Sequence, residues 1–106
     1  MSYRFMRVIV MFDLPTDTSM DRRHYRWFRK FLIGEGFVMM QESIYTKICI
    51  NMHAVERVEA SIRKNKPPKG IVQMMVTTER QFTGMQLITG EVNNNYVQTD
   101  ERMVIL

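Results

Sequence analysis

One carboxylate in this sequence lies where it could take part in chemistry. Asp13 directly follows the apolar residues Val8–Phe12 and precedes Leu14 and Pro15. Proline cannot continue a strand ladder, so Asp13 is expected at the end of a strand. Its side chain either accepts backbone hydrogen bonds in the next loop or binds Mg²⁺, an ion that takes only one or two protein carboxylates.

The second interpretation makes Asp13 both a metal ligand and a catalytic residue. One carboxylate per chain gives a metal ion only one protein ligand. A symmetric dimer would bring two copies of Asp13 near its axis, where they would share one Mg²⁺ ion. Asp17 and Asp21 follow at four-residue intervals and would supplement this site. Capping already accounts for both, because Thr18 and Asp21 form a capping-box pattern at the start of a helix, where carboxylates also suit the helix dipole.

A basic helix face is the second feature that could take part in chemistry. Helical spacing runs from Thr18 to about Glu35, and at about 100° per residue five cations fall within an arc of about 120°. They are Arg22, Arg23, Arg26, Arg29 and Lys30. The opposite, apolar side is expected to hold Met20, His24, Trp27, Phe28, Phe31 and Leu32. Charged helix faces are usually only solvated, but no acid relieves the repulsion here, which favours a polyanionic partner.

The stretch Arg63–Lys69 forms a second basic cluster, in which Lys64, Lys66 and Lys69 are candidate phosphate-binding residues. Cations at the end of a helix also complement its dipole, so a purely structural role stays open. Neither cluster has a pattern that reads bases. Nucleic-acid binding through them should therefore be independent of sequence and sensitive to salt.

Other chemistries find little support. Cys49 is the only cysteine and lies between Ile48 and Ile50, which excludes an internal disulfide and predicts a buried thiol. His24 and His53 lack the spacing of a metal site or a catalytic pair. The sequence has no P-loop, dinucleotide-binding, His-Glu-x-x-His or Gly-x-Ser-x-Gly motif, so nucleotide binding and serine-based hydrolysis are unsupported.

The elements that would position these residues alternate between strand and helix. Strands are expected at Arg4–Phe12, Phe37–Ile50 and Ile71–Thr77, and helices at Thr18–Glu35 and from Asn51 to about Asn65. The middle strand region is either one long bent strand or a hairpin interrupted near residues 42 and 43, and residues 78–81 form a turn or a single helical turn. This order predicts an α+β, ferredoxin-like βαββαβ sandwich whose two helices cover one face of the sheet.

Length and composition fit one globular domain that spans residues 1–106. The chain has a mass of 12.7 kDa, 45% hydrophobic residues and 25% charged residues. Lysine and arginine number 15 against 11 acids, which gives a net charge of +4 and suits a polyanionic partner. No apolar run approaches the roughly 18 residues of a membrane span and no signal peptide is recognisable, so we expect a cytoplasmic protein.

The C-terminal segment, residues 96–106, ends in four apolar residues. They are Met103, Val104, Ile105 and Leu106. An exposed apolar edge strand would invite aggregation. We therefore expect this extra strand to form a dimer interface with a second subunit, which makes the protein a homodimer.

Several stretches together resemble a known family. They are Met11–Thr16, Tyr25–Leu32, Gly36–Phe37, Gln41–Tyr45 and Glu101–Leu106. Each is weak alone, but the combination is specific, and the similarity runs from the first strand through Thr77. The chain resembles the CRISPR-associated endoribonuclease family, the small partner in spacer acquisition, and most closely its type II variety.

This resemblance implies a ferredoxin-like homodimer whose C-terminal strand extends the sheet of the partner, with a divalent metal bound through Asp13. It also implies assembly with the CRISPR-associated integrase, between whose dimers the small dimer holds duplex protospacer DNA. Many family members have tyrosine where this chain has Phe12, so a phenolic hydroxyl is absent at that position.

The resemblance settles binding better than catalysis and leaves two hypotheses. The first is a Mg²⁺-dependent phosphodiesterase that cuts RNA, including single-stranded RNA, or DNA. The second is a non-catalytic adaptor that spans duplex DNA and bridges integrase subunits. A ligand-sensing regulatory domain is less favoured, because the sequence shows no polar pocket pattern.

Overall fold

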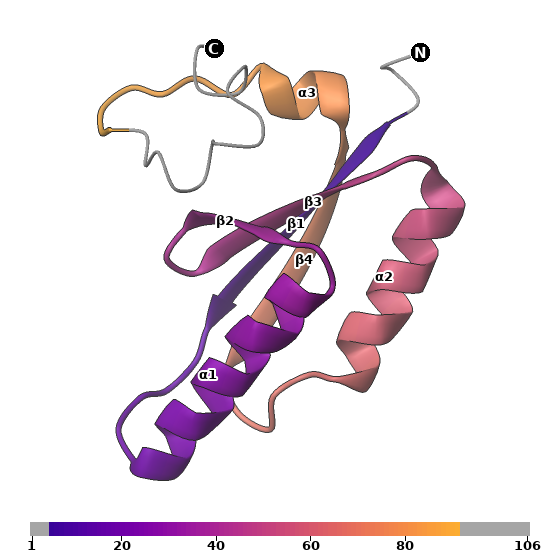
Figure 1. Ribbon diagram of the computed structural model, residues 1–106. Helices are drawn as coiled ribbons and strands as arrows, with labels where there is room; N and C mark the ends of the chain where they lie inside the picture. The colour runs from indigo at the N-terminus through magenta and orange to yellow at the C-terminus, as the bar shows by residue number, and fades with distance from the viewer. Residues whose placement is uncertain (1–4, 92–106) are drawn as a thin grey trace.

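A four-stranded antiparallel sheet with its two long helices packed on one face forms this protein (Figure 1). The computed structural model describes residues 5–91. The elements are β1 (Met6–Asp13), α1 (Ser19–Gly34), β2 (Val38–Gln41), β3 (Ile44–Cys49), α2 (Met52–Lys64), β4 (Ile71–Thr78) and α3 (Glu79–Thr83). The strand order is β2-β3-β1-β4. This topology confirms the expected ferredoxin-like βαββαβ fold.

The region between the two main helices is a hairpin and not one bent strand. β2 pairs antiparallel with β3, and Glu42 and Ser43 form the turn between them. The register shifts between Met39 and Gln41, which marks an irregularity in β2. The predicted turn near residue 78 is the short helix α3, whose first turn is closed by a capping box between Thr78 and Gln81.

The core lies between the helices and the even-numbered residues of β1. Val8, Val10 and Phe12 are buried, as neighbours on one face of a strand should be. The ring of Phe12 meets Phe28 of α1 edge to face at 5.3 Å between ring centroids and lies 5.7 Å from Tyr45 of β3. The odd-numbered residues of β1 therefore point to the opposite face of the sheet, which the two long helices leave uncovered.

Only part of the apolar side of α1 enters the core. Phe28 and Leu32 are buried, but Met20 is 53% exposed and Trp27 is 46% exposed. The buried residues of the helix are Asp21, Phe28 and Leu32, so the helix faces the sheet on one edge of its apolar side. Met20 and Trp27 lie on the same side of the helix but outside the core. The α2 residues that the spacing placed in the core are buried: Val55, Val58 and Ile62.

A buried ion pair attaches α3 to the uncovered face of the sheet. Arg7 of β1 is only 4% exposed, and its Nε donates a hydrogen bond of 2.8 Å to Oε1 of Glu79. A second guanidinium nitrogen of Arg7 donates a hydrogen bond to Oγ1 of Thr46 at 3.3 Å. The Cζ atom of Arg7 lies 4.1 Å from the ring centroid of Phe82. The Arg7 charge is therefore paired, hydrogen-bonded and stacked, which are the conditions under which a buried guanidinium is tolerated.

Two further expectations concern the C-terminal segment and membrane-spanning helices. The predicted pairing segment 96–106, with Met103–Leu106, lies outside the described residues, so its pairing stays a prediction. None of the helices within residues 5–91 is long and apolar enough to cross a bilayer.

Glu79→Ala should lower the free energy of unfolding by about 3 kcal/mol, because the buried Arg7 guanidinium would lose its charged partner. Urea unfolding followed by circular dichroism measures the loss. The double variant Arg7→Met/Glu79→Leu removes both charges and should recover a large part of it.

A matched control is the ion pair of Glu59 with Arg63 on α2, at 2.9 Å, which is exposed. Glu59→Ala should cost less than about 1 kcal/mol. Equal losses for the Glu59 and Glu79 variants would show that the Arg7 pair does not hold α3.

Candidate metal site and nucleic-acid interface

Asp13 ends β1 on the sheet face opposite the helices. Its side chain is exposed, and none of the described residues donates a hydrogen bond to it. The interpretation in which Asp13 accepts backbone hydrogen bonds in the next loop is therefore not what the structure shows. The carboxylate is available for a ligand from outside the chain.

The loop between α2 and β4 packs directly against the main chain of Asp13. Gly70 has a φ of +92°, and a Cβ built on it would lie 2.7 Å from the carbonyl oxygen of Asp13 and 2.7 Å from Cδ2 of Leu14. Only glycine combines this conformation with so close an approach. Asp13 also pairs with Ile71 of β4. The strand end that carries the candidate ligand is thus fixed by packing and by the sheet.

Asp21 serves the helix and not the candidate metal site. Its backbone N–H donates to Oγ1 of Thr18 at 3.0 Å, and its Oδ2 accepts from the backbone N–H of Thr18 at 3.3 Å. Burial acts to raise the pKa of Asp21, but hydrogen bonding by Thr18 and the nearby charge of Lys69 outweigh it and lower the pKa. The capping role expected for Asp21 is confirmed. Asp17 is exposed in the preceding loop.

Metal binding by one chain is limited by the number of ligands. Among residues 5–91, no group of three or more histidine, cysteine, aspartate or glutamate side chains is placed to hold a metal ion. Asp13 nevertheless suits Mg²⁺, which accepts one or two carboxylates and fills its remaining positions with water and phosphate oxygens. The ligand chemistry fits, and a second carboxylate would have to come from another molecule.

Two of the five α1 cations are bonded within the protein. A terminal guanidinium nitrogen of Arg22 donates to the carbonyl oxygen of Thr16 at 3.0 Å, and Nε of Arg29 donates to the hydroxyl of Tyr45 at 2.7 Å. Arg22 therefore steadies the loop before α1, and Arg29 joins α1 to β3. Either residue would have to share or break these bonds to bind a phosphate.

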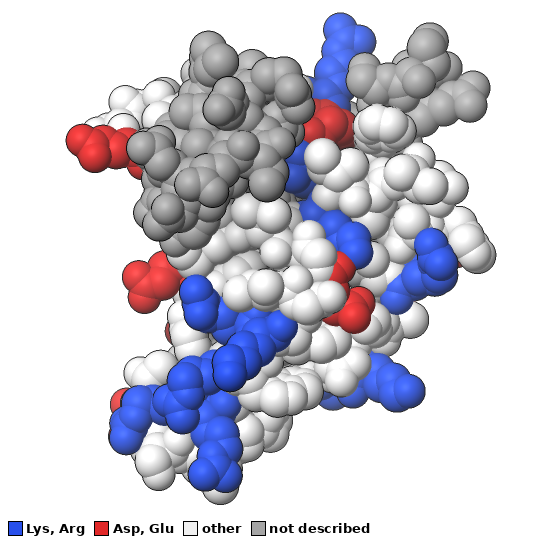
Figure 2. Space-filling model, viewed as in Figure 1, with Lys and Arg blue, Asp and Glu red and all other residues white. Residues whose placement is uncertain are grey.

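The other three α1 cations are exposed and have no partner within residues 5–91. Arg23, Arg26 and Lys30 make no hydrogen bond or ion pair with any described residue. Figure 2 shows lysine and arginine side chains gathered over α1, with few acidic side chains among them. We call these three residues the free cations of α1. They are the part of the predicted basic face that can bind a polyanion without breaking an existing bond.

The three lysines of the second basic cluster also differ in whether the described residues offer them a partner. Lys69 Nζ lies 3.6 Å from Oδ1 of Asp21, which places the end of the cluster beside the first turn of α1. Lys64, in the last turn of α2, and Lys66 are exposed, and neither has a partner among the residues that the structure describes. Lys69 is thus the residue of this cluster that the structure brings to α1.

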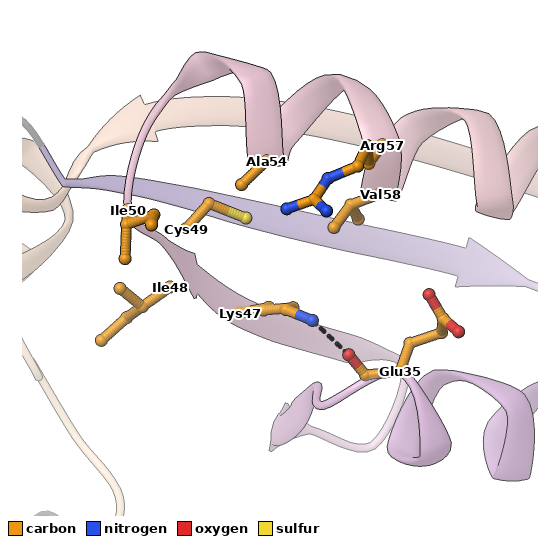
Figure 3. A pocket seen from close by; sticks show the side chains of 8 residues that line it. All are labelled: Glu35, Lys47, Ile48, Cys49, Ile50, Ala54, Arg57 and Val58. Atoms are coloured by element: carbon orange, nitrogen blue, oxygen red, sulfur yellow. Dashed lines mark hydrogen bonds between the residues drawn. The ribbon is translucent and has the colours of Figure 1, made fainter.

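A cavity of about 410 Å³ lies far from Asp13, between α2, the end of β3 and the end of α1 (Figure 3). The cavity lies near the first residue of β1, at the other end of the strand from Asp13, because Cys49 in the cavity wall pairs with Met6. Lys47 Nζ donates a hydrogen bond to the carbonyl oxygen of Glu35 across its mouth. Burial raises the pKa of the Cys49 thiol, although Lys47 and Arg57 act to lower it. The thiol is buried, as expected, and is not an activated nucleophile.

Comparison with known proteins identifies the family. Residues 6–85 match the model of the family described as CRISPR associated protein Cas2. This chain belongs to the Cas2 family. The CRISPR-associated endoribonuclease Cas2 of Treponema denticola is 48% identical over 101 residues, which cover 95% of this chain and 100% of that protein.

Further Cas2 relatives cover a similar share of the chain. The CRISPR-associated endoribonuclease Cas2 of Streptococcus mutans is 44% identical over 101 residues, or 95% of this chain and 93% of that protein. The protein of that name from Campylobacter jejuni is 34% identical over 103 residues, or 97% of this chain and 72% of its own. A crystal structure of cas2 shares the fold, with a TM-score of 0.57, 13% identity, and coverage of 84% of this chain and 90% of that one.

In this Cas2-family chain, the residue before the candidate metal ligand belongs to the core. Phe12 is 6% exposed and packs among aromatic rings on the helix side of the sheet. Asp13 points to the other side, because adjacent residues of a strand face in opposite directions. Phe12 therefore supports Asp13 by packing and supplies no group to its ligand.

Gly70→Ala should lower the free energy of unfolding by about 2–4 kcal/mol, because the added methyl group meets the backbone of Asp13 and the backbone angle is strained. Chemical unfolding followed by circular dichroism gives the value. Gly34→Ala is the matched control, since a Cβ there has no neighbour within 4 Å and alanine suits a helix end. If Gly70→Ala were as stable as Gly34→Ala, the two loops would not be in this contact in solution.

Proposed function

We propose that this chain is a CRISPR adaptation protein that binds duplex protospacer DNA as a homodimer and bridges the CRISPR-associated integrase. The observation that carries DNA binding is the set of free cations on α1, Arg23, Arg26 and Lys30, which are exposed and have no partner within residues 5–91. Phosphates would displace only water and counterions from them, and counterion release is the main source of sequence-independent affinity. Membership of the Cas2 family supports the role in CRISPR systems.

Homodimer formation is supported by the sheet face that the two long helices leave uncovered. Four large apolar side chains there, Val38, Ile48, Ile71 and Met75, are 41–57% exposed. Strand pairing aligns Ile71 with Asp13, so the apolar residues and the carboxylate share this face. A second copy packed on it would bury the apolar side chains and bring two Asp13 residues to one interface.

Endonuclease activity on RNA or DNA is the second part of the proposal, and it is supported by the exposed carboxylate of Asp13, which bonds none of the described residues. Bound Mg²⁺ would supply polarisation of a phosphate oxygen and a more acidic water ligand. The carboxylate of Asp13 would hold the ion, with the copy from a second subunit as its partner. The cations of α1 would hold the phosphate backbone of the substrate and offset its charge.

A purely structural adaptor is the alternative, and one observation favours it. Within the described residues, Asp13 belongs to no group of three or more histidine, cysteine, aspartate or glutamate side chains that could hold a metal ion. The adaptor and the nuclease would use the same DNA-binding surface. They differ in whether the Asp13 carboxylate is required.

Asp13→Asn should abolish Mg²⁺-dependent cleavage of RNA and DNA, with a loss of at least about 100-fold, because the amide is a much poorer ligand for a hard cation. The dimer should stay folded, since the side chain bonds no described residue. Gel assays with and without EDTA, together with sedimentation analysis, measure both. Asp17→Asn, an exposed aspartate in the adjacent loop, is the matched control and should cut normally.

The same variant separates the two functions in a reconstituted spacer-integration assay with the integrase. Integration that survives Asp13→Asn would favour the adaptor, and integration that disappears together with cleavage would favour the nuclease. Undiminished cleavage by Asp13→Asn would assign the activity to another residue or to a contaminant.

The triple variant Arg23→Gln/Arg26→Gln/Lys30→Gln should weaken binding of blunt duplex DNA at least about tenfold at moderate salt. The slope of log affinity against log salt should fall by about 0.9 for each phosphate that the variant no longer neutralises. Fluorescence anisotropy at several salt concentrations measures both. Arg63→Gln is a control, because this exposed arginine is already paired with Glu59. Unchanged affinity and slope in the triple variant would exclude α1 as the DNA-binding face.

A further inference from the structure

Trp27 is the only tryptophan of the chain, and it lies on the surface of α1. Its indole stacks on Phe31, with ring centroids 5.9 Å apart and planes inclined by 11°. Phe31 in turn stacks on the buried ring of Phe28, with centroids 6.1 Å apart. A column of three rings thus runs from the core to the surface, and its outer member is 46% exposed to water.

This exposure is unfavourable for the isolated chain. Indole offers a large apolar surface, and burying it would stabilise the fold. Phe28, one residue further along the same helix, is completely buried. The structure therefore holds a large aromatic ring at the surface, stacked on Phe31, where it can contact a ligand.

The free cations of α1 border this ring. At about 100° per residue, Arg23 and Lys30 project within about 60° of Trp27, and Arg26 projects about 100° away on the same side. The only acidic residue of α1, Asp21, is buried and occupied by capping. The surface beside the indole is therefore cationic, and its charges have no partner among the described residues.

We infer that Trp27, supported by Phe31, stacks on an unpaired base of a nucleic-acid strand whose phosphates lie along Arg23, Arg26 and Lys30. An exposed aromatic ring next to cations is the arrangement by which proteins bind single strands, and it tolerates any sequence because every base has a π-face. Bases inside a duplex are stacked on each other and offer no such face. The inference rests on the proposed function for its cationic surface and adds a site for unpaired nucleotides.

The single tryptophan makes the site directly observable. Wild-type protein is titrated with a short oligothymidylate and, separately, with a blunt duplex of the same length, while tryptophan fluorescence is recorded. The single strand should quench the fluorescence in proportion to binding, and the blunt duplex should bind with little quenching. A response that is the same for both probes would contradict the stacking of an unpaired base.

Variants provide a second measurement that does not depend on the fluorescence of Trp27. With a labelled oligothymidylate, Trp27→Leu should bind about tenfold more weakly than wild type, and Trp27→Phe should restore much of the affinity. Ile33→Ala is the matched control, because Ile33 is also apolar, is 49% exposed and lies on the same helix. Thermal unfolding checks that each variant is folded.

The failure of this inference can be distinguished from failure of the proposed function. Blunt-duplex binding with no quenching by the single strand and no effect of Trp27→Leu would overturn the stacking site and leave duplex binding in place. Quenching by the single strand without any duplex binding would reject duplex binding and keep the stacking site. A fluorescence change caused only by the integrase, and not by any oligonucleotide, would identify Trp27 as a protein contact and overturn the inference.

Discussion

Side chains along β1 alternate between the two faces of the sheet, and this alternation determines where both the core and the candidate site lie. β1 is a central strand, paired with β3 on one side and β4 on the other. Val8, Val10 and Phe12 point to the helices, whereas Arg7 and Asp13 belong to the opposite face. A slip of one residue in the register would exchange the two sets, placing a carboxylate in the core and a phenylalanine at the surface.

The order of elements could be predicted because each has a local cause. Periodicity separated strands from helices, Thr18 and Asn51 supplied the N-caps, and the prolines after Lys66 ended the second helix. The exposure of Trp27 could not be predicted. Helical spacing gives the angles between residues but not the direction in which the helix faces the sheet, and here α1 is turned so that Phe28 and Leu32 point inward.

The candidate site was also only partly accessible from sequence. The position of Asp13 at a strand end followed from its neighbours, but the role of Gly70 depends on a contact between loops that are 57 residues apart in the chain. In the same way, the five cations of α1 look equivalent in a helical projection. Only the folded chain shows that Arg22 and Arg29 are bonded to Thr16 and Tyr45, and that the free charge is concentrated in the other three.

The contrast between the buried charge of Arg7 and the exposed charges of α1 has a practical consequence for handling this protein. Mobile ions reach surface charges easily, but they scarcely weaken an ion pair that is shielded from water. A concentrated salt wash should therefore release any polyanion held by the α1 cations, while α3 stays attached to the sheet. Affinity chromatography with such a wash would keep the protein folded and remove any nucleic acid bound in this way.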